Sequence, residues 1–159
     1  MDYNDFLDQV DPQYREFAVA THKQMLQGGC KLKVTLAKNG YVISYQHGKK
    51  KRVIMNFVFR KSGLVARIYG DFAGQYPDFI DSLPEDMIKS IEKAPNCKRF
   101  EDPPRCSSKC VGYVFSVLGS QHQKCRYNCF MFIVDDESIP YIKAFLEKEL
   151  NMRNNEQYE

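Results

Sequence analysis

Four short segments with strand-like alternation follow one another between residues 31 and 69, separated only by tight turns. Asn39-Gly40 and Lys61-Ser62-Gly63 are typical of hairpin turns, because glycine readily adopts the positive φ angles that such turns need. Connections this short join antiparallel neighbours. The pattern therefore predicts an antiparallel four-stranded meander. Its predicted strands are 31–37, 41–45, 52–60 and 64–69, and in the first of them Leu32, Val34 and Leu36 are expected to face the core.

Helical patterns flank the meander on both sides. Asp11-Pro12 is a favourable helix start and Gly28-Gly29 a favourable stop, which predicts a helix between them, and residues 3–8 add a short helical turn before it. The capping box Ser82-Leu-Pro-Glu85 predicts a second helix. A third helix is predicted to begin near residues 138–140.

Two further strands, 111–118 and 124–134, are predicted to pair as a C-terminal hairpin. The predicted fold class is therefore α+β: an antiparallel sheet, made of the four-stranded meander plus this hairpin, with about three helices packed on it. With 159 residues, 43% of them hydrophobic, the chain is long enough for one core. We expect a single domain over 1–150, a Cys-rich segment at 96–129 and a frayed polar tail at 151–159.

Composition and charge exclude some classes of protein. The formal net charge of +3 is small for a domain built to bind a nucleic-acid backbone. No apolar run approaches the roughly 20 residues of a membrane span. The N-terminal residues are acidic and lack the pattern of a signal peptide, so we expect a cytoplasmic protein, in which disulfides are uncommon.

Five of the six cysteines lie between residues 97 and 129. Cys97, Cys106 and Cys110 share one loop-like stretch, and Cys125 begins the strand that is predicted to return toward it. Four thiolates that converge from separate backbone stretches are a typical zinc site. The sequence therefore predicts zinc as cofactor, held by Cys97, Cys106, Cys110 and Cys125, with His122 as a substitute ligand.

Other interpretations of these cysteines stay open. In a regular strand Cys125 and Cys129 would lie about 13 Å apart, too far for one ion, so we assign Cys129 to the core. The cluster could instead hold an iron–sulfur centre, pack as free thiols or form disulfides. Lysines and arginines flank it, and nearby positive charge lowers the pKa of a reactive or regulatory thiol.

One face of the predicted meander mixes polar and apolar residues. If Met55, Phe57 and Phe59 face the helices, the opposite face displays Asn56, Arg67 and Tyr69 among valines. A solvated face would be more polar, and a buried face would not carry an arginine and an asparagine. The face is predicted to be a ligand groove, an anion site centred on Arg67, or the seat of the C-terminal half. Asn56, Arg67 and Tyr69 are the candidate ligand-binding residues.

The turn Lys49-Lys50-Lys51-Arg52 could contact phosphates, but such runs are more often solvated hairpin tips. The sequence contains no Gly-rich phosphate loop, no Gly-x-Ser-x-Gly elbow and no His-Glu-x-x-His helix. None of these catalytic classes is therefore indicated.

Four stretches resemble those of a small uncharacterised bacterial protein family of unknown function: Arg67-Ile-Tyr-Gly-Asp71, Leu83-Pro84, Ala94-Pro-Asn-Cys-Lys-Arg99 and Lys124-Cys-Arg-Tyr127. The resemblance spans most of the chain. It implies a bacterial cytoplasmic protein, and it implies no activity and no functional residues.

Together these patterns predict a non-catalytic, zinc-stabilised α+β domain that binds a small ligand or a protein partner. A thiol-dependent redox enzyme or hydrolase is the first alternative, and it would use one cysteine of low pKa. Nucleic-acid binding through residues 49–52 is the second, although the small net charge makes nucleic acid an unfavoured partner.

Overall fold

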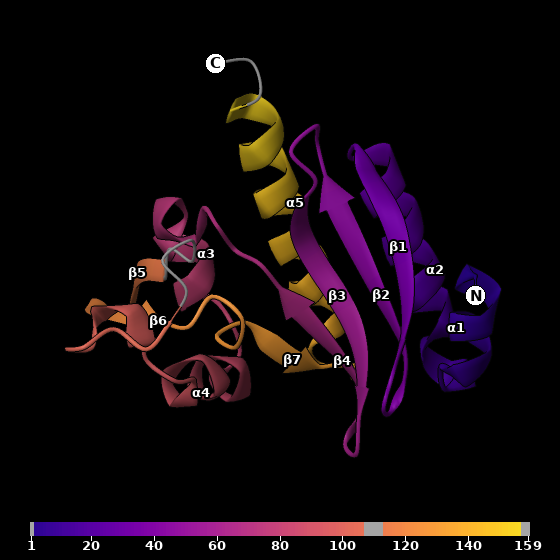
Figure 1. Cartoon of the computed structure of the whole chain (residues 1–159), viewed down its shortest axis with the longest axis horizontal. Coiled ribbons are helices and arrows are strands. Elements are labelled where there is room, and N and C mark those ends of the chain that lie inside the picture. Colours follow the sequence, from indigo (N-terminus) through magenta and orange to yellow (C-terminus); the bar gives the residue numbers. More distant parts are fainter. Residues whose placement is uncertain (1, 107–112, 157–159) are drawn as a thin grey trace.

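A five-stranded antiparallel sheet forms the centre of the protein (Figure 1). The structure is a computed structural model and describes residues 2–106 and 113–156. In spatial order, the strands are β1 (Cys30–Ala37), β2 (Gly40–His47), β3 (Arg52–Arg60), β4 (Gly63–Ile68) and β7 (Met131–Ile133). A separate two-stranded hairpin consists of β5 (Tyr113–Val117) and β6 (Ser120–Lys124). The predicted α+β class with an antiparallel sheet is confirmed.

The helices among the described residues are α1 (Tyr3–Gln9), α2 (Pro12–Gln27), α3 (Pro77–Asp81), α4 (Glu85–Lys93) and α5 (Ile139–Glu156), with two short 3-10 helices, η1 (Ala73–Gln75) and η2 (Lys98–Phe100). The start of α2 is as predicted, because the Asp11 side chain accepts a hydrogen bond from the backbone N–H of Gln13. Figure 1 shows α3, α4 and the β5–β6 hairpin gathered at one end of the molecule, beyond β7.

The first four strands form because each turn supplies the backbone that a hairpin needs. Gly40 and Gly63 have φ angles of 137° and 118°, where other residues are strained. The predicted meander of β1 to β4 is confirmed. Its strands pair antiparallel in sequence order, with one register shift between Tyr45 and Gln46.

The core lies between the sheet and the helices α1, α2 and α5. Met55 and Phe57 of β3 are fully buried, as predicted, together with Ala66 and Ile68 of β4, whereas Phe59 is only partly buried. Phe57 contacts the rings of Phe6 and Phe17, and Phe132 of β7 contacts Phe145 of α5. Each such buried ring contributes about 1.5–3 kcal/mol, so this layer holds both termini of the described chain onto one face of the sheet.

The C-terminal strands differ from the prediction. Leu118 and Gly119 have φ angles of 48° and 84°, so they form a two-residue turn that joins β5 directly to β6. Residues 120–123, which were expected in the connection between the two predicted strands, are therefore part of β6. The chain then turns over residues 126–130, and β7 pairs with β4 in the main sheet. Local alternation could not show this, because β4 and β7 are distant in sequence.

Three smaller predictions are wrong. Ser82 does not cap α4; its hydroxyl donates to the carbonyl of Phe79, and it follows α3, which was not predicted. Leu36 is 63% exposed rather than buried, since β1 is an edge strand with a neighbour on one side only. Residues 151–156 are helical rather than frayed, because Arg153 is buried against the sheet; residues 157–159 lie outside the described range.

Candidate functional site

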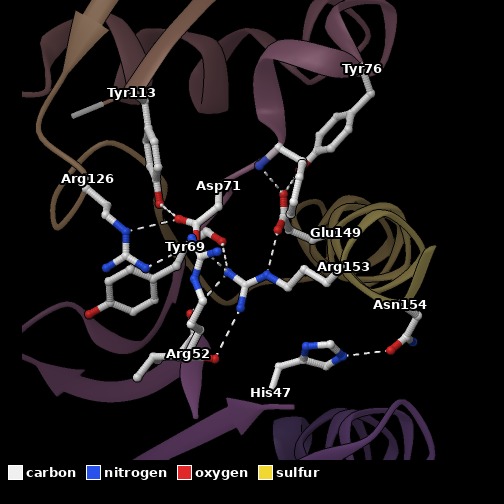
Figure 2. A network of polar contacts seen from close by, with 12 residues as sticks. His47, Arg52, Tyr69, Asp71, Tyr76, Tyr113, Arg126, Glu149, Arg153 and Asn154 are labelled. Atoms are coloured by element: carbon white, nitrogen blue, oxygen red, sulfur yellow. Dashed lines mark hydrogen bonds and ion pairs between the residues drawn. The ribbon is translucent and has the colours of Figure 1, made fainter. Parts of the chain in front are cut away.

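Asp71 follows β4 and lies at the centre of a network of polar side chains (Figure 2). Its side chain is 6% exposed and accepts hydrogen bonds of 3.0 and 3.3 Å from the guanidinium group of Arg126. Arg52 forms an ion pair with the same carboxylate, and Arg153 forms another at 3.3 Å. The hydroxyl of Tyr113 donates a hydrogen bond of 2.9 Å. One buried carboxylate thus binds three guanidinium groups and a phenol.

Arg153 joins the last helix to the sheet. Its side chain is 4% exposed, and its Nε donates to the carboxylate of Glu149 at 2.8 Å. Its terminal nitrogens donate to the backbone carbonyls of Arg52, Val53 and Tyr69. The Glu149 carboxylate, fully buried, also accepts from the backbone N–H of Phe72 and from the hydroxyl of Tyr76. Both charges of this pair are fully partnered, which indicates a structural role.

The network shifts the pKa values of its members. Burial alone would raise the pKa of Asp71, but hydrogen bonds from Arg126 and Tyr113 and the charges of Arg153 and Arg126 outweigh burial, so its pKa lies below the ordinary value. Burial raises the pKa of Tyr76 and of Tyr113, and the nearby carboxylates raise both further. Both phenols therefore remain protonated donors at neutral pH.

A row of side chains crosses the sheet on the face opposite the core. The register aligns Lys33 with Ser44, Ser44 with Asn56, Asn56 with Arg67, and Arg67 with Met131. Residues directly opposite one another point to the same face of a sheet, so these five side chains form one row. Asn56 Nδ2 donates to Ser44 Oγ at 2.6 Å. Arg67 therefore lies in the sheet with Asn56 on one side and Met131 on the other.

Arg67 is almost fully buried, yet no described carboxylate pairs with it. The residue is 3% exposed. Its Nη1 lies 3.5 Å from Asn56 Oδ1, which is long for a hydrogen bond, and its Nη2 lies 3.8 Å from the weakly accepting Sδ of Met131. The Tyr127 ring covers the guanidinium group, with 3.7 Å between Cζ and the ring centroid. Within the described part of the chain, Arg67 Nε has no hydrogen-bond partner.

Two tyrosines connect Arg67 to the Asp71 network. The rings of Tyr69 and Tyr127 lie 6.5 Å apart, and the guanidinium group of Arg126 lies over the Tyr69 ring, 4.6 Å from its centroid. Burial raises the pKa of Tyr69, and the charges of Arg67 and Arg126, together with a side-chain hydrogen bond from Arg67, oppose that increase. Cations and aromatic faces therefore alternate across this region, an arrangement that stabilises each cation by about 0.5–2 kcal/mol.

Four arginines gather here, and we call them the arginine cluster: Arg52, Arg67, Arg126 and Arg153. Among the described residues they pair with two carboxylates, Asp71 and Glu149, which leaves two positive charges in excess. The side chains of Arg52 and Arg126 are 51% and 28% exposed, so water stabilises part of this excess. Arg67 lacks that contact with water. A buried guanidinium group without a carboxylate partner can bind a carboxylate or a phosphate.

The sequence predicted Asn56, Arg67 and Tyr69 as ligand-binding residues, and the structure brings all three into this region. That they bind a ligand stays a prediction. The alternative prediction was that the C-terminal half packs on this face. Two residues of that half, Met131 and Tyr127, do contact Arg67. Alternation could not identify Asp71, Arg126 or Tyr127, since they lie on connections between strands.

Two of the predicted zinc ligands, Cys97 and Cys125, lie on neighbouring backbone segments. An antiparallel bridge joins Asn96 to Lys124, and the N–H groups of the two cysteines donate across it at 3.0 and 2.9 Å. This register puts both side chains on the same side of the bridge as diagonal neighbours. Cys97 is buried, and Cys125 is partly exposed.

The other two predicted ligands are less well placed or lie outside the described residues. Cys106 is exposed, although a hydrogen bond of 3.1 Å from Arg105 N to Lys98 O closes the loop between Cys97 and Cys106. Cys110 lies outside the described residues. Over residues 2–106 and 113–156, no group of three or more His, Cys, Asp or Glu side chains could hold a metal ion. Zinc binding stays a prediction.

The reason given for leaving Cys129 out of the metal site is wrong. Cys125 and Cys129 are not on one strand; the N–H of Cys129 donates to the carbonyl of Cys125 at 3.0 Å, as in one turn of a helix. Residues at this spacing lie on one side of a turn, about 6 Å apart. Cys129 is fully buried, and burial raises its pKa well above the ordinary value. Cys129 is therefore a neighbour of Cys125, but a protonated one.

Two residues near the basic turn, Arg52 and His47, have side-chain partners. Arg52 pairs with Asp71, while Lys49, Lys50 and Lys51 remain exposed at the tip, so the nucleic-acid prediction depends on lysines alone. His47 lies 2.7 Å from Asn154 Oδ1, a contact that adds to the attachment of α5.

No protein-family model matches this chain, and neither a curated protein nor a solved structure matches it. Among the described helices, none has the length and apolar character to cross a membrane. The resemblance to a bacterial family stays a prediction. The function is therefore inferred from the residues of the site themselves.

Proposed function

We propose that this protein is a non-catalytic binding domain whose arginine cluster takes up the anionic group, a carboxylate or a phosphate, of a small ligand or a protein partner. One observation carries the proposal: Arg67 is 3% exposed and its Nε has no partner within the described chain. Burying a charged group without full compensation costs several kcal/mol. Without a ligand, the folded protein bears this free-energy cost with no compensating gain. A bound anion would remove the cost by accepting a hydrogen bond from Arg67 Nε.

The geometry of Arg67 favours one edge of the guanidinium group. Nε and Nη2 lie on the same edge of the planar fork; Nη2 makes a weak contact with Met131 Sδ, and Nε has no hydrogen-bond partner among the described residues. Carboxylate and phosphate oxygens match that fork with two parallel hydrogen bonds. The other edge, which includes Nη1, faces Asn56.

Tyr127 covers one face of the Arg67 guanidinium group, and in the proposed mode its side chain moves aside when the anion enters. The residue is 54% exposed and lies on the turn between β6 and β7, so rotation of its side chain uncovers the guanidinium group without moving a strand. Rotamer changes of exposed side chains take picoseconds to nanoseconds. Arg126 and the ring of Tyr69 form the neighbouring wall.

Thermal unfolding in the presence of anions tests this function. We expect phosphate or acetate to raise the Tm of the protein relative to chloride at equal ionic strength. An anion at 100 times its Kd stabilises the folded state by about 2.7 kcal/mol. Arg67→Met should abolish the response. Arg60→Met is the matched control, because Arg60 is an exposed arginine at the end of β3, and it should respond like the natural protein. Equal responses in all three proteins would contradict the proposal.

A second candidate role is structural: zinc bound by Cys97, Cys106, Cys110 and Cys125 would order the Cys-rich segment of a cytoplasmic protein. The bridge that aligns Cys97 with Cys125 supports it. We expect about one equivalent of zinc in protein purified without added metal, and its loss in Cys97→Ser but not in Cys30→Ser. Less than about half an equivalent in the natural protein, with all thiols titratable, would rule this role out.

A further inference from the structure

A pocket of about 320 Å³ lies between α4 and β7, beside the Arg67 site. Small-molecule pockets start at about this size. Apolar residues of the strand and the helix line it, namely Met87, Met131, Phe132 and Ile133. Three exposed carboxylates also line it, those of Asp86, Asp135 and Glu137, and no lysine or arginine does so among the described residues. The pocket therefore combines apolar walls with an acidic opening, on a chain whose net charge is +3.

Met131 belongs both to this pocket and to the Arg67 site. It lies opposite Arg67 in the register of β4 and β7, and its Sδ is 3.8 Å from Arg67 Nη2. Nη2 shares its edge of the guanidinium group with the unpartnered Nε. The available edge of Arg67 therefore points toward the residue that forms the pocket wall. A positive group and three carboxylates lie on the two sides of one flexible thioether side chain.

Resting on the proposed function, we propose that the ligand of Arg67 is zwitterionic. Its anionic group binds the Nε–Nη2 edge of Arg67, an aliphatic segment packs on Met131 and Ile133, and a cationic group lies among Asp86, Asp135 and Glu137. A purely anionic ligand that entered the pocket would be repelled by the three carboxylates. An ammonium or guanidinium group is attracted by them, and burying its aliphatic part contributes about 0.8 kcal/mol per CH₂.

The carboxylates differ in how they are held. Asp135 Oδ1 accepts the backbone N–H of Ser138 at 2.7 Å, which fixes its position before α5. Asp86 lies in the first turn of α4 and has no described hydrogen-bond partner for its side chain. Asp86 can therefore be neutralised without removing a described hydrogen bond. Glu92, an exposed residue on the same helix that does not line the pocket, provides the matched control.

The test uses α,ω-amino acids from 4-aminobutanoate to 8-aminooctanoate, with alkanoates of equal length as probes that lack the amine. NMR of methionine methyl groups in the whole protein measures binding, with the Met131 signal assigned through Met131→Leu. We expect the Met131 methyl to report an optimum at one chain length, where the amino acid binds at least tenfold more tightly than its alkanoate. Asp86→Asn should remove this tenfold advantage without weakening alkanoate binding, while Glu92→Gln should change neither.

The outcomes separate this inference from the proposed function. If alkanoates bind in an Arg67-dependent manner but the amine adds nothing, or if its advantage survives Asp86→Asn, the zwitterion is ruled out and the anion site stands. If no alkanoate perturbs the Met131 methyl and none of the amino acids does, both the zwitterion and the anion site are contradicted.

Discussion

Two buried arginines of the same cluster should respond in opposite ways to the same substitution. In Arg67→Met the protein loses a guanidinium group that is 3% exposed and has an unpartnered Nε. Relief of the unmet hydrogen bond is worth about 1–3 kcal/mol, and loss of the contact with Tyr127 costs about 0.5–2 kcal/mol. Without ligand, we therefore expect Arg67→Met to change the free energy of unfolding by between about −1 and +2.5 kcal/mol, a range whose centre lies on the side of greater stability.

Arg153→Met should instead be strongly destabilising. Arg153 donates to Glu149, to Asp71 and to three backbone carbonyls, and Glu149 is fully buried. Removing one partner of a buried pair leaves an uncompensated charge, which costs about 3–5 kcal/mol. The two arginines are similarly buried, so the contrast depends on their partners and not on exposure.

Urea unfolding in a buffer without phosphate or carboxylate measures both effects. The midpoint should change little or rise for Arg67→Met and should fall for Arg153→Met, with unchanged m values. A loss of more than about 2 kcal/mol in Arg67→Met would refute the reasoning, since Arg67 would then be a stabilising structural residue that needs no ligand.

Three further predictions concern pH, thiols and a turn. The folded-state pKa of Asp71 lies below the ordinary value, so the stability that its charge contributes is complete above pH ~4 and is lost as the pH falls through the folded-state pKa. The difference in unfolding free energy between the natural protein and Asp71→Asn, measured by urea titration, should therefore shrink below pH ~4. A difference that stays constant with pH would contradict this. Cys106 is exposed whereas Cys129 is fully buried with a raised pKa, so mass spectrometry after brief alkylation at pH 7.5 should find Cys106 modified well before Cys129, and the reverse order would be inconsistent with the structure. Gly119→Ala should lower the free energy of unfolding by about 1–2 kcal/mol, because its φ is +84°, a conformation that strains alanine. No atom lies within 4 Å of the added methyl group, so backbone strain is the whole effect. An unchanged urea midpoint would show that this turn does not adopt the left-handed conformation.

The meander could be predicted because its signals are local. Asn39-Gly40 and Ser62-Gly63 specify turns through backbone conformation, and alternation then fixes which face each side chain takes. The same alternation placed Asn56 and Arg67 on the same mixed face. This is the part of the candidate site that lies on regular strands.

The rest of the site depends on contacts between distant segments. Asp71 acquires its role only when α5 brings Arg153 and the turn after β6 brings Arg126. Residues 124–134 are easily taken for one strand, because polar and apolar residues alternate up to Cys129 and an apolar run follows. The turn over residues 126–130 that separates β6 from β7 has no glycine or proline to mark it. That error also removed Cys129 from consideration as a neighbour of Cys125.

The fraying predicted after Asn151 was wrong for a related reason. A polar C-terminal segment normally frays, but Arg153 and Asn154 find specific partners on the sheet and on His47. Tertiary hydrogen bonds of this kind have no signature in composition. They are the reason that α5 extends to Glu156.

The most direct measurement of the central claim is the ¹⁵N–¹H signal of Arg67 Nε, assigned by its absence in Arg67→Met. On titration with acetate or phosphate at constant ionic strength, this signal should shift saturably and its proton should exchange more slowly with water, because the unpartnered donor gains an acceptor. A signal that stays unchanged while those of exposed arginines shift would contradict the anion site.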